Sequence, residues 1–288
     1  MSTAQLRREI SLLRERRPSR RREIPPGPVE LAHVAGLEAL DAWQHAALRS
    51  EAPRLLFNVT RQGGKSTVSG LLSADMALRV PGSLTLILAP AERQAKETFG
   101  KAARFYTATG RVVPPDSYRK LGIELANGSR IEALPGTEKT IRGFSEVDLL
   151  IVEEAARVAD ELVYAARPFL AVSGGRLAML STPAGRRGVF HHEWTEGEGW
   201  ERYEVKATQI PRIPTAFLEE ERRTLPARIY RQEYECSFEE VDDAVFAYDL
   251  IEEAITPEVA PLFGPESKPP TQAKPGEAPE DIAPLFGA

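Results

Sequence analysis

The chain has 288 residues, of which 42% are hydrophobic and 27% are charged, and it contains 23 prolines and a single cysteine. This length and composition predict a globular protein with one large domain and exclude a chain that is disordered throughout. No apolar run reaches the ~18 residues typical of a membrane span, and the arginine-interrupted N-terminus is not typical of a signal peptide. Because a lone Cys236 cannot form an internal disulfide, we expect a reducing, cytoplasmic location.

The net charge of −5 is unevenly distributed along the chain. Residues 1–23 hold eight arginines against three glutamates, which predicts a basic N-terminal arm or helix. This arm is either a solvated helix or a contact for DNA or a partner, and the sequence leaves both readings open. Residues 24–246 form the expected globular domain.

The last part of the chain is rich in proline. Residues 257–288 hold eight prolines and carry a net charge of −3, and the segment Ala-Pro-Leu-Phe-Gly occurs twice, at 260–264 and 283–287. We expect residues 247–288 to form a short helical remnant and then a disordered tail, because they have too little apolar surface to offset their chain entropy. The repeated segment is either a docking peptide or part of a spacer.

Short apolar strands alternate with helical patterns along the expected domain. The predicted strands cover Arg54–Val59, Leu84–Ala89, Gly122–Leu125, Arg130–Leu134, Asp148–Val152, Arg176–Leu180 and Glu201–Ala207. The predicted helices cover Thr3–Arg17, a short stretch ending at Arg49, Gly64–Val80, Ala91–Tyr106, Ala155–Val172 and parts of Pro214–Tyr234. This alternation predicts an α/β fold in which a mostly parallel sheet is flanked by helices on both faces.

The strongest motif is residues 60–67 (TRQGGKST), between a predicted strand and a predicted helix. A bound phosphate needs close backbone N–H donors, a helix N-terminus and a cation, and its Mg²⁺ needs a hydroxyl. Gly63 and Gly64 permit the close approach, Lys65 supplies the cation and Ser66 the hydroxyl. Although the strict pattern has another glycine in place of Val59, the flanking elements favour a phosphate-binding loop.

A second motif is the apolar run that ends in Glu153 and Glu154. Such a strand places two carboxylates at the carboxyl edge of the sheet, beside the phosphate loop. One acid can hold hydrated Mg²⁺ while the next orients or deprotonates an attacking water. The alternative is a pair of acids favoured by the dipole at a helix N-terminus.

Together these motifs resemble the ATPase half of the tailed-phage terminase large subunit, a DNA-packaging motor with a P-loop NTPase fold of the ASCE/RecA-like kind. The matching segments, in the family's order, are 43–44 (WQ), 61–67 (RQGGKST), 89–90 (AP), 93–95 (RQA), 141–143 (IRG), 149–156 (LLIVEEAA) and 181–185 (STPAG) followed by Gly188 and Phe190. Arg-Gln inside the phosphate loop and Ser-Thr-Pro-x-Gly after a later strand are distinctive of this family.

The resemblance implies roles for several of the matching residues. Those implied to bind ATP are Trp43, Gln44, Arg61, Gln62, Gly63, Gly64, Lys65, Ser66 and Thr67. Those implied to act in hydrolysis are Glu154 as the catalytic carboxylate, Arg61 as an internal arginine finger and Thr182 as the coupling residue. Those implied to hold Mg²⁺ are Ser66 and Glu153. The alternative is core packing for Trp43, a surface salt bridge for Arg61, and a strand-end turn for Thr182.

Two features depart from the family's pattern. Glu153 stands where the family usually has aspartate, so slower hydrolysis is a possible consequence. Terminase large subunits normally continue into a nuclease domain, but only 42 residues follow Phe246, whereas an independent domain needs roughly 100. We therefore expect this chain to lack nuclease activity of its own.

The resemblance implies an ATP-hydrolysing motor that moves double-stranded DNA into a capsid, in the cytoplasm of a bacterial host. Its implied partners are DNA, a portal protein, a small terminase subunit and a separately encoded nuclease, and its implied state on the portal is a homo-oligomeric ring. Two alternatives stay open: a helicase-like or repair ATPase, and an ATPase-impaired prophage remnant or adaptor.

We do not expect residues 191–193 (HHE) to bind a metal, because no matching Cys or His partners exist.

Overall fold

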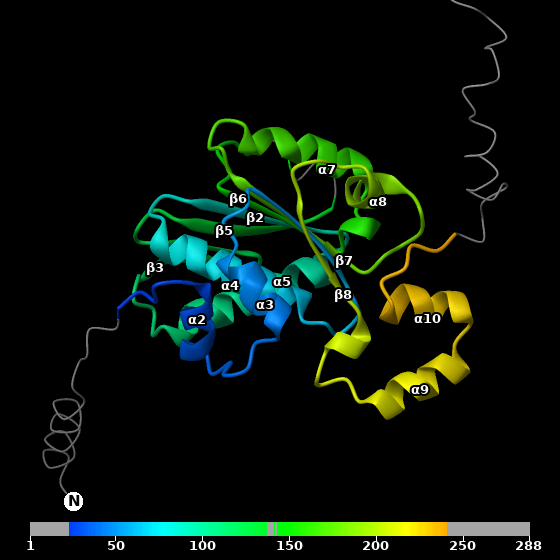
Figure 1. Ribbon diagram of the computed structural model, residues 1–288. Coiled ribbons are helices and arrows are strands. Elements are labelled where there is room, and N and C mark those ends of the chain that lie inside the picture. Colours follow the sequence, from blue (N-terminus) through cyan, green and yellow to red (C-terminus); the bar gives the residue numbers. More distant parts are fainter. Residues whose placement is uncertain (1–22, 137–140, 142, 241–288) are drawn as a thin grey trace, which may run out of the picture. The chain divides into compact units, whose positions relative to one another are not determined.

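A computed structural model describes residues 23–136, 141 and 143–240 (Figure 1). Nearly all of the predicted basic arm, the C-terminal tail with its repeated segment, Arg142 and the predicted domain boundary at residue 246 lie outside the described residues. None of the helices in the described part is both long enough and apolar enough to cross a membrane.

An eight-stranded sheet forms the centre of the described domain, with the strand order β3-β4-β5-β2-β6-β7-β1-β8. Its strands are β1 (Arg54–Val59), β2 (Leu84–Ala89), β3 (Pro115–Arg119), β4 (Gly122–Leu125), β5 (Arg130–Pro135), β6 (Leu149–Glu153), β7 (Arg176–Ser181) and β8 (Glu201–Val205). In this order, every pair of neighbouring strands from β5 through β2, β6, β7 and β1 to β8 is parallel. The β3–β4 and β4–β5 pairs are antiparallel. The predicted mostly parallel sheet is confirmed.

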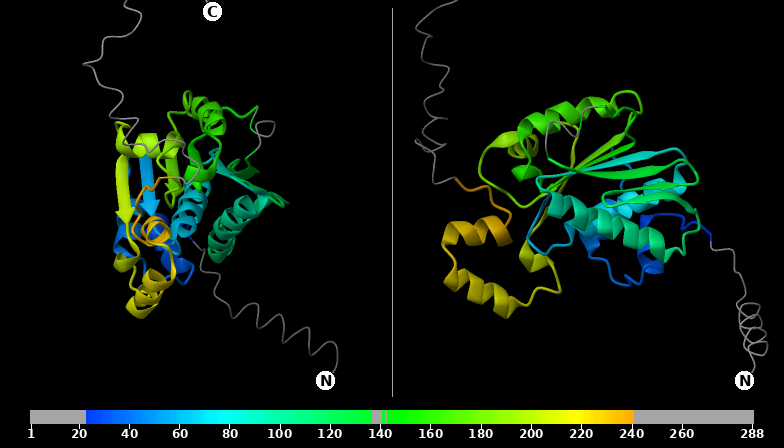
Figure 2. Two further views of the ribbon diagram at one scale, coloured as in Figure 1. Left: turned by 90° about the vertical axis from the view of Figure 1, so that its right-hand side faces the viewer. Right: turned by 180° about the vertical axis from the view of Figure 1, so that it is seen from behind.

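Helices cover both faces of this sheet (Figure 2). The α-helices are α2 (Pro28–Val34), α3 (Ala42–Arg49), α4 (Lys65–Arg79), α5 (Glu92–Ala108), α7 (Asp160–Ala166), α8 (Gly188–Thr195), α9 (Thr215–Thr224) and α10 (Ala227–Tyr234). Because side chains alternate along a strand, Leu55 and Phe57 of β1 pack with α2–α5, whereas Leu56 packs with α7 and α8. The sheet is therefore buried on both sides, as the apolar strands predict.

The predicted helix over Ala155–Val172 is wrong as a single element. The structure instead has a 3₁₀ turn η1 (Ala155–Arg157), then α7, then a second 3₁₀ turn η2 (Arg167–Leu170). Glu154 precedes η1 in the left-handed region, at φ 50°, and the backbone at Val158 and Ala159 is extended, so the helix begins only at Asp160. Apolar spacing alone did not reveal these backbone breaks.

Strand β3 has no counterpart among the predicted strands. It lies at the sheet edge, pairs only with β4 among the described strands, and most of its side chains are exposed. An exposed edge strand has no need of apolar residues, so its sequence lacks the pattern that identifies a buried strand. The adjoining β4–β5 hairpin is predicted correctly, with Gly128 in its turn at φ 83°.

The segment that carries α9 and α10 is fastened to the carboxyl end of β1. The side-chain amide of Asn58 donates to the carbonyl of Cys236 at 2.8 Å, and the thiol of Cys236 donates to Val205 O at 3.1 Å. The hydroxyl of Thr60 donates to the carbonyl of Glu233 at 2.8 Å. A region distant in sequence is thereby fixed beside the loop that follows β1.

Gly175, just before β7, is expected to tolerate no side chain. A Cβ there would lie 2.1 Å from Val147 O and 2.9 Å from Asp148 O, and both are backbone atoms with little freedom to move. We therefore expect Gly175→Ala to lower the free energy of unfolding by roughly 1–3 kcal/mol, measured by urea denaturation. Gly100→Ala is the matched control: Gly100 lies within α5 with open space around it, so this change should raise stability by about 0.5–1 kcal/mol. Equal effects at the two positions would contradict the steric argument.

Candidate active site

The loop between β1 and α4 has the backbone of a phosphate-binding loop. Gly63 has no room for a side chain, since a Cβ there would lie 2.4 Å from Val59 Cγ1 and 2.9 Å from Thr60 O. Gly64 caps α4 in the left-handed conformation, at φ 95°. These two residues let the chain turn sharply and present the N-terminus of a 15-residue helix to a ligand.

Lys65 is the first residue of α4 and is only 7% exposed. Its ammonium donates to Val59 O at 3.1 Å and to Thr60 O at 3.4 Å, and it lies 4.0 Å from Glu154 Oε1. Burial lowers the pKa of Lys65, while the carboxylates of Glu154 and Glu153 act in the opposite direction. This lysine is a buried cation held by weak acceptors, which a phosphate could replace.

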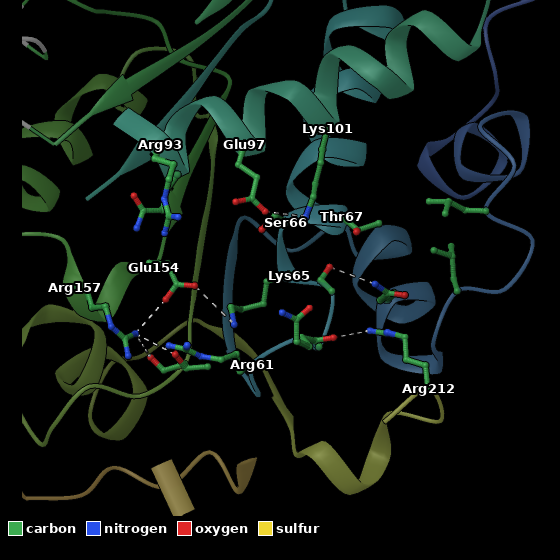
Figure 3. A pocket seen from close by; sticks show the side chains of 18 of the residues that line it. Arg61, Lys65, Ser66, Thr67, Arg93, Glu97, Lys101, Glu154, Arg157 and Arg212 are labelled. Carbon is green, nitrogen blue, oxygen red and sulfur yellow. Dashed lines mark hydrogen bonds and ion pairs between the residues drawn. The ribbon is translucent and has the colours of Figure 1, made fainter. Parts of the chain in front are cut away.

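A cavity of about 670 Å³ lies over this loop (Figure 3). Its wall brings together side chains from the phosphate loop, α3, α5 and the loops that follow β6, β7 and β8. The residues from the predicted site that line it are Gln44, Arg61, Gln62, Gly63, Gly64, Lys65, Ser66, Thr67, Glu154 and Thr182. The cavity is also lined by Arg93, from the matched segment 93–95, and by Glu97, Lys101, Arg157 and Arg212, which the sequence did not single out. The cavity is strongly cationic, which suits a polyanionic ligand.

The two neighbouring carboxylates occupy different environments. Glu154 lines the cavity, whereas Glu153 is the last residue of β6, is 2% exposed and does not line it. Burial raises the pKa of Glu153, while a hydrogen bond with Ser69 and the charge of Lys65 lower it. Its Oε1 has no hydrogen-bond partner in the described part of the chain. A buried carboxylate oxygen without a partner is suited to a cation or a cation-bound water.

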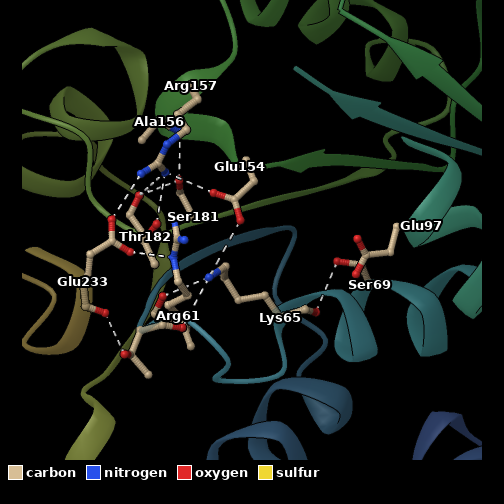
Figure 4. A network of polar contacts seen from close by, with 12 residues as sticks. Arg61, Lys65, Ser69, Glu97, Glu154, Ala156, Arg157, Ser181, Thr182 and Glu233 are labelled. Atoms are coloured by element: carbon tan, nitrogen blue, oxygen red, sulfur yellow. Dashed lines mark hydrogen bonds and ion pairs between the residues drawn. The ribbon is translucent and has the colours of Figure 1, made fainter. Parts of the chain in front are cut away.

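A polar network joins the phosphate loop to the ends of β6 and β7 (Figure 4). Arg61 Nε lies 2.7 Å from Glu233 Oε2, an ion pair whose angles fall outside those of a hydrogen bond. Glu233 Oε1 lies 3.7 Å from Arg157 Nη2. Arg157 Nη1 in turn lies 3.1 Å from Glu154 Oε2 and 3.0 Å from Thr182 Oγ1. The network thus joins three predicted residues through two, Arg157 and Glu233, that were not predicted.

The two residues predicted to recognise adenine differ in position. Gln44 lines the cavity; its side chain donates to Gly64 O at 3.3 Å and accepts from Asp41 N at 3.0 Å. Trp43 does not line the cavity and packs edge-on against Phe57 of the core, with ring centroids 6.1 Å apart. The structure therefore places Trp43 where its alternative, core packing, expected it.

Arg212, which follows β8, also fastens the phosphate loop. Its guanidinium donates to Gln62 O at 3.1 Å and forms an ion pair with Asp41, the N-cap of α3. Gln62 adopts a left-handed conformation at φ 59°, which is unusual for a residue other than glycine. Nothing in the local sequence of Arg212 marks it, because its partners are distant in the chain.

The donor set fits a nucleotide-bound Mg²⁺ better than a metal held by protein alone. The described residues contain no group of three or more His, Cys, Asp or Glu side chains placed to hold a metal ion. Ser66 in the cavity and the unpartnered oxygen of Glu153 beneath it are the kind of sparse oxygen donors that Mg²⁺ uses when phosphates and waters supply the rest. Glu193 of the HHE segment is instead buried and bound to Arg167 and Trp200.

The raised pKa of Glu153 predicts a pH-dependent effect of Glu153→Gln. A carboxyl group whose pKa is higher in the folded than in the unfolded state destabilises the fold as pH rises above its ordinary value near 4.5. Glutamine does not titrate. The stability of Glu153→Gln relative to wild type should therefore increase between pH 5 and pH 8, as measured by urea unfolding without nucleotide or metal. A stability difference that is independent of pH would contradict the desolvation of this carboxylate.

The sequence is similar to that of a phage terminase subunit. No family model matches the chain. The large terminase subunit of Escherichia phage T5 is 26% identical to it over 196 residues, which cover 65% of this chain and 44% of the phage T5 protein. The match therefore spans less than half of that relative's length.

Solved structures of large terminases share the fold. The ATPase domain of the Thermus phage P74-26 large terminase aligns with a TM-score of 0.65 at 22% identity, covering 72% of this chain and 97% of that domain. The large terminase of another thermophilic bacteriophage, in complex with ADP, aligns with a TM-score of 0.60 at 13% identity over 69% of this chain and 54% of its own. The HK97 bacteriophage large terminase aligns with a TM-score of 0.57 at 15% identity, covering 69% of this chain and 51% of its own. The resemblance predicted from the motifs is thus confirmed: the chain is similar to tailed-phage terminase large subunits, and its described domain has the fold of their ATPase domain.

Proposed function

We propose that this chain is an ATPase that drives DNA packaging in a phage or prophage terminase. The observation that carries the proposal is the position of Lys65 at the N-terminus of α4, 4.0 Å from Glu154, with both residues lining a cationic cavity. A buried lysine at a helix N-terminus suits a triphosphate, and a carboxylate facing it suits an attacking water. The similarity to large terminases supplies the packaging context.

The phosphate loop would bind the triphosphate through the backbone N–H groups around Gly63 and Gly64. Lys65 would leave the carbonyls of Val59 and Thr60 for the phosphate oxygens. Ser66 and, through water, Glu153 would hold Mg²⁺, whose charge stabilises the negative charge of the phosphates when it is bound. Gln44 stands at the same cavity with a side-chain amide able to reach an adenine edge if it released Gly64 O.

Glu154 would orient and deprotonate the water that attacks the γ-phosphate. Arg61 is 63% exposed in its side chain and bound only to Glu233 through its guanidinium in the described part of the chain, so it can turn toward the phosphate and stabilise developing charge there. Thr182 directly follows β7 and lines the same cavity. Its hydroxyl would report the loss of the γ-phosphate to the rest of the motor.

Packaging adds requirements that lie beyond the nucleotide site. We propose that the substrate is double-stranded DNA and that the chain acts on a portal as a homo-oligomeric ring, together with a small terminase subunit. These partners follow from the family resemblance rather than from any contact among the described residues.

Lys65→Ala tests the nucleotide site. Loss of the buried ammonium removes the cation for the β- and γ-phosphates, so we expect turnover of ATP to fall at least about 100-fold, measured by phosphate release with and without double-stranded DNA. Lys120→Ala is the matched control, since Lys120 pairs with Glu92 on the surface, and its turnover should stay within twofold of wild type. A wild-type protein without turnover, with or without DNA, would overturn the proposed ATPase.

Glu154→Gln separates catalysis from binding. The amide keeps the shape of the side chain but cannot accept a proton, so turnover should fall about 100-fold or more while the affinity for ATP changes by less than about threefold. The affinity is measured with a fluorescent nucleotide. Turnover near the wild-type rate would show that Glu154 is not the catalytic carboxylate.

Separation of a forked duplex by the wild-type protein would instead favour the helicase-like alternative.

A further inference from the structure

We propose that Arg157 is the residue that positions Glu154, and that it does so through a contact shared with Thr182. The inference rests on the proposed ATPase function and adds a residue to it. Arg157 lies three residues after Glu154, at the end of the 3₁₀ turn η1. None of the motifs that carry the family resemblance includes it.

The first argument is the backbone of Glu154. This residue has φ 50° and ψ 44°, a left-handed conformation that costs energy for any residue with a side chain. The turn that follows is closed by Arg157 N, which donates to Glu154 O at 2.7 Å. A strained conformation persists only where its surroundings impose it. The arginine backbone thus helps to hold the carboxylate residue in an unusual orientation, with its side chain in the cavity.

The second argument is the arrangement of cations around the Glu154 carboxylate. Oε1 lies 4.0 Å from Lys65 Nζ, and Oε2 lies 3.1 Å from Arg157 Nη1. When Lys65 turns to the phosphates of a bound nucleotide, Arg157 is the cation that still holds Glu154. Because Arg157 binds one oxygen, the other remains directed toward the phosphate loop. This is the orientation that a water-activating carboxylate needs.

The third argument is that Arg157 connects Glu154 to the end of β7. The same Nη1 that binds Glu154 lies 3.0 Å from Thr182 Oγ1 and 3.4 Å from Thr182 O. A second contact fastens the turn to this strand, because Ala156 N donates to Ser181 Oγ at 3.2 Å. Any displacement of Thr182 must therefore change the contact that orients Glu154. A single guanidinium makes the catalytic carboxylate and the coupling residue dependent on each other.

The fourth contact of Arg157 reaches α10. Its Nη2 lies 3.7 Å from Glu233, the carboxylate that also binds Arg61. The planar guanidinium has donors pointing in several directions, so it can serve Glu154, Thr182 and Glu233 at once. Lysine has the same charge but only a compact ammonium, which cannot keep this geometry. The arrangement therefore predicts that replacing Arg157 by alanine, which removes the charge, lowers kcat more than replacing it by lysine, which removes only the planar guanidinium.

The experiment compares Arg157→Ala, Arg157→Lys and a matched control, Arg167→Ala. Arg167 also binds a glutamate, Glu193, and its side chain is 39% exposed against 33% for Arg157, but it does not line the cavity. We expect Arg157→Ala to lower kcat roughly 10- to 100-fold with KM and nucleotide affinity changed by less than about threefold. Arg157→Lys should give an intermediate kcat, and Arg167→Ala should keep kcat within twofold of wild type.

Amide hydrogen exchange supplies a readout that does not need turnover. In Arg157→Ala, residues 153–158 and 181–185 should exchange faster than in wild type, and they should not do so in Arg167→Ala. A kcat within twofold of wild type for Arg157→Ala, or unchanged exchange at 181–185, would overturn the positioning role while leaving the ATPase intact. A wild-type protein without turnover would instead overturn the proposed function, and with it the role of Glu154 that Arg157 is inferred to support.

Discussion

The candidate site depends on one geometric constraint: parallel strands end at the same edge of a sheet. Strands β1, β6 and β7 lie side by side in the order β6-β7-β1, and their carboxyl ends lead into the phosphate loop, Glu154 and Thr182. Glu154 and Thr182 follow the phosphate loop by about 90 and 120 residues in the chain, and they are 28 residues apart from each other. Their convergence needs no direct contact between the segments, because β6, β7 and β1 pair as parallel neighbours and so end at the same edge. The polar network refines an arrangement that hydrophobic packing has made.

Within this arrangement, every cation of the phosphate loop is already bound to a protein acceptor. Lys65 is held by the carbonyls of Val59 and Thr60, and Arg61 by the carboxylate of Glu233. A bound triphosphate must therefore compete with these acceptors. For Lys65 the competitors are neutral carbonyls in a buried site, where an anion is much the stronger partner. For Arg61 the competitor is a carboxylate, so its transfer depends more strongly on the geometry around the γ-phosphate.

Most of the fold could be predicted from the sequence because the central strands are short, apolar and bounded by clear turns. Strands β1 and β2 begin and end at the predicted residues, and the phosphate loop lies between the predicted strand and helix. The single helix predicted over Ala155–Val172 failed because apolar spacing does not reveal a left-handed residue such as Glu154. Strand β3 was missed because an exposed edge needs no apolar pattern.

The predicted site was incomplete for a different reason. Motifs identify residues that contact a ligand, whereas Arg157, Glu233 and Arg212 contact other protein groups that are mostly remote in the chain. Only the pair Glu154 and Arg157, three residues apart, could have been recognised from the local sequence. That recognition would have required knowing that a 3₁₀ turn follows Glu154. Trp43 shows the converse case: a motif residue that lies against the core and not in the cavity.

The contacts of α10 with the phosphate loop determine how a movement of Arg61 can affect α10. Glu233 contacts this loop through its backbone as well as its side chain, since its carbonyl accepts from Thr60 Oγ1 at 2.8 Å and from Arg61 N at 3.2 Å. If Arg61 turns toward a phosphate, the side-chain ion pair is lost but the backbone contacts can remain. Glu233 then keeps its place beside Arg157 Nη2, at 3.7 Å, which is not the nitrogen that holds Glu154 and Thr182. In the proposed ATPase, α10 would therefore stay attached to the phosphate loop through its backbone contacts when Arg61 turns toward a phosphate.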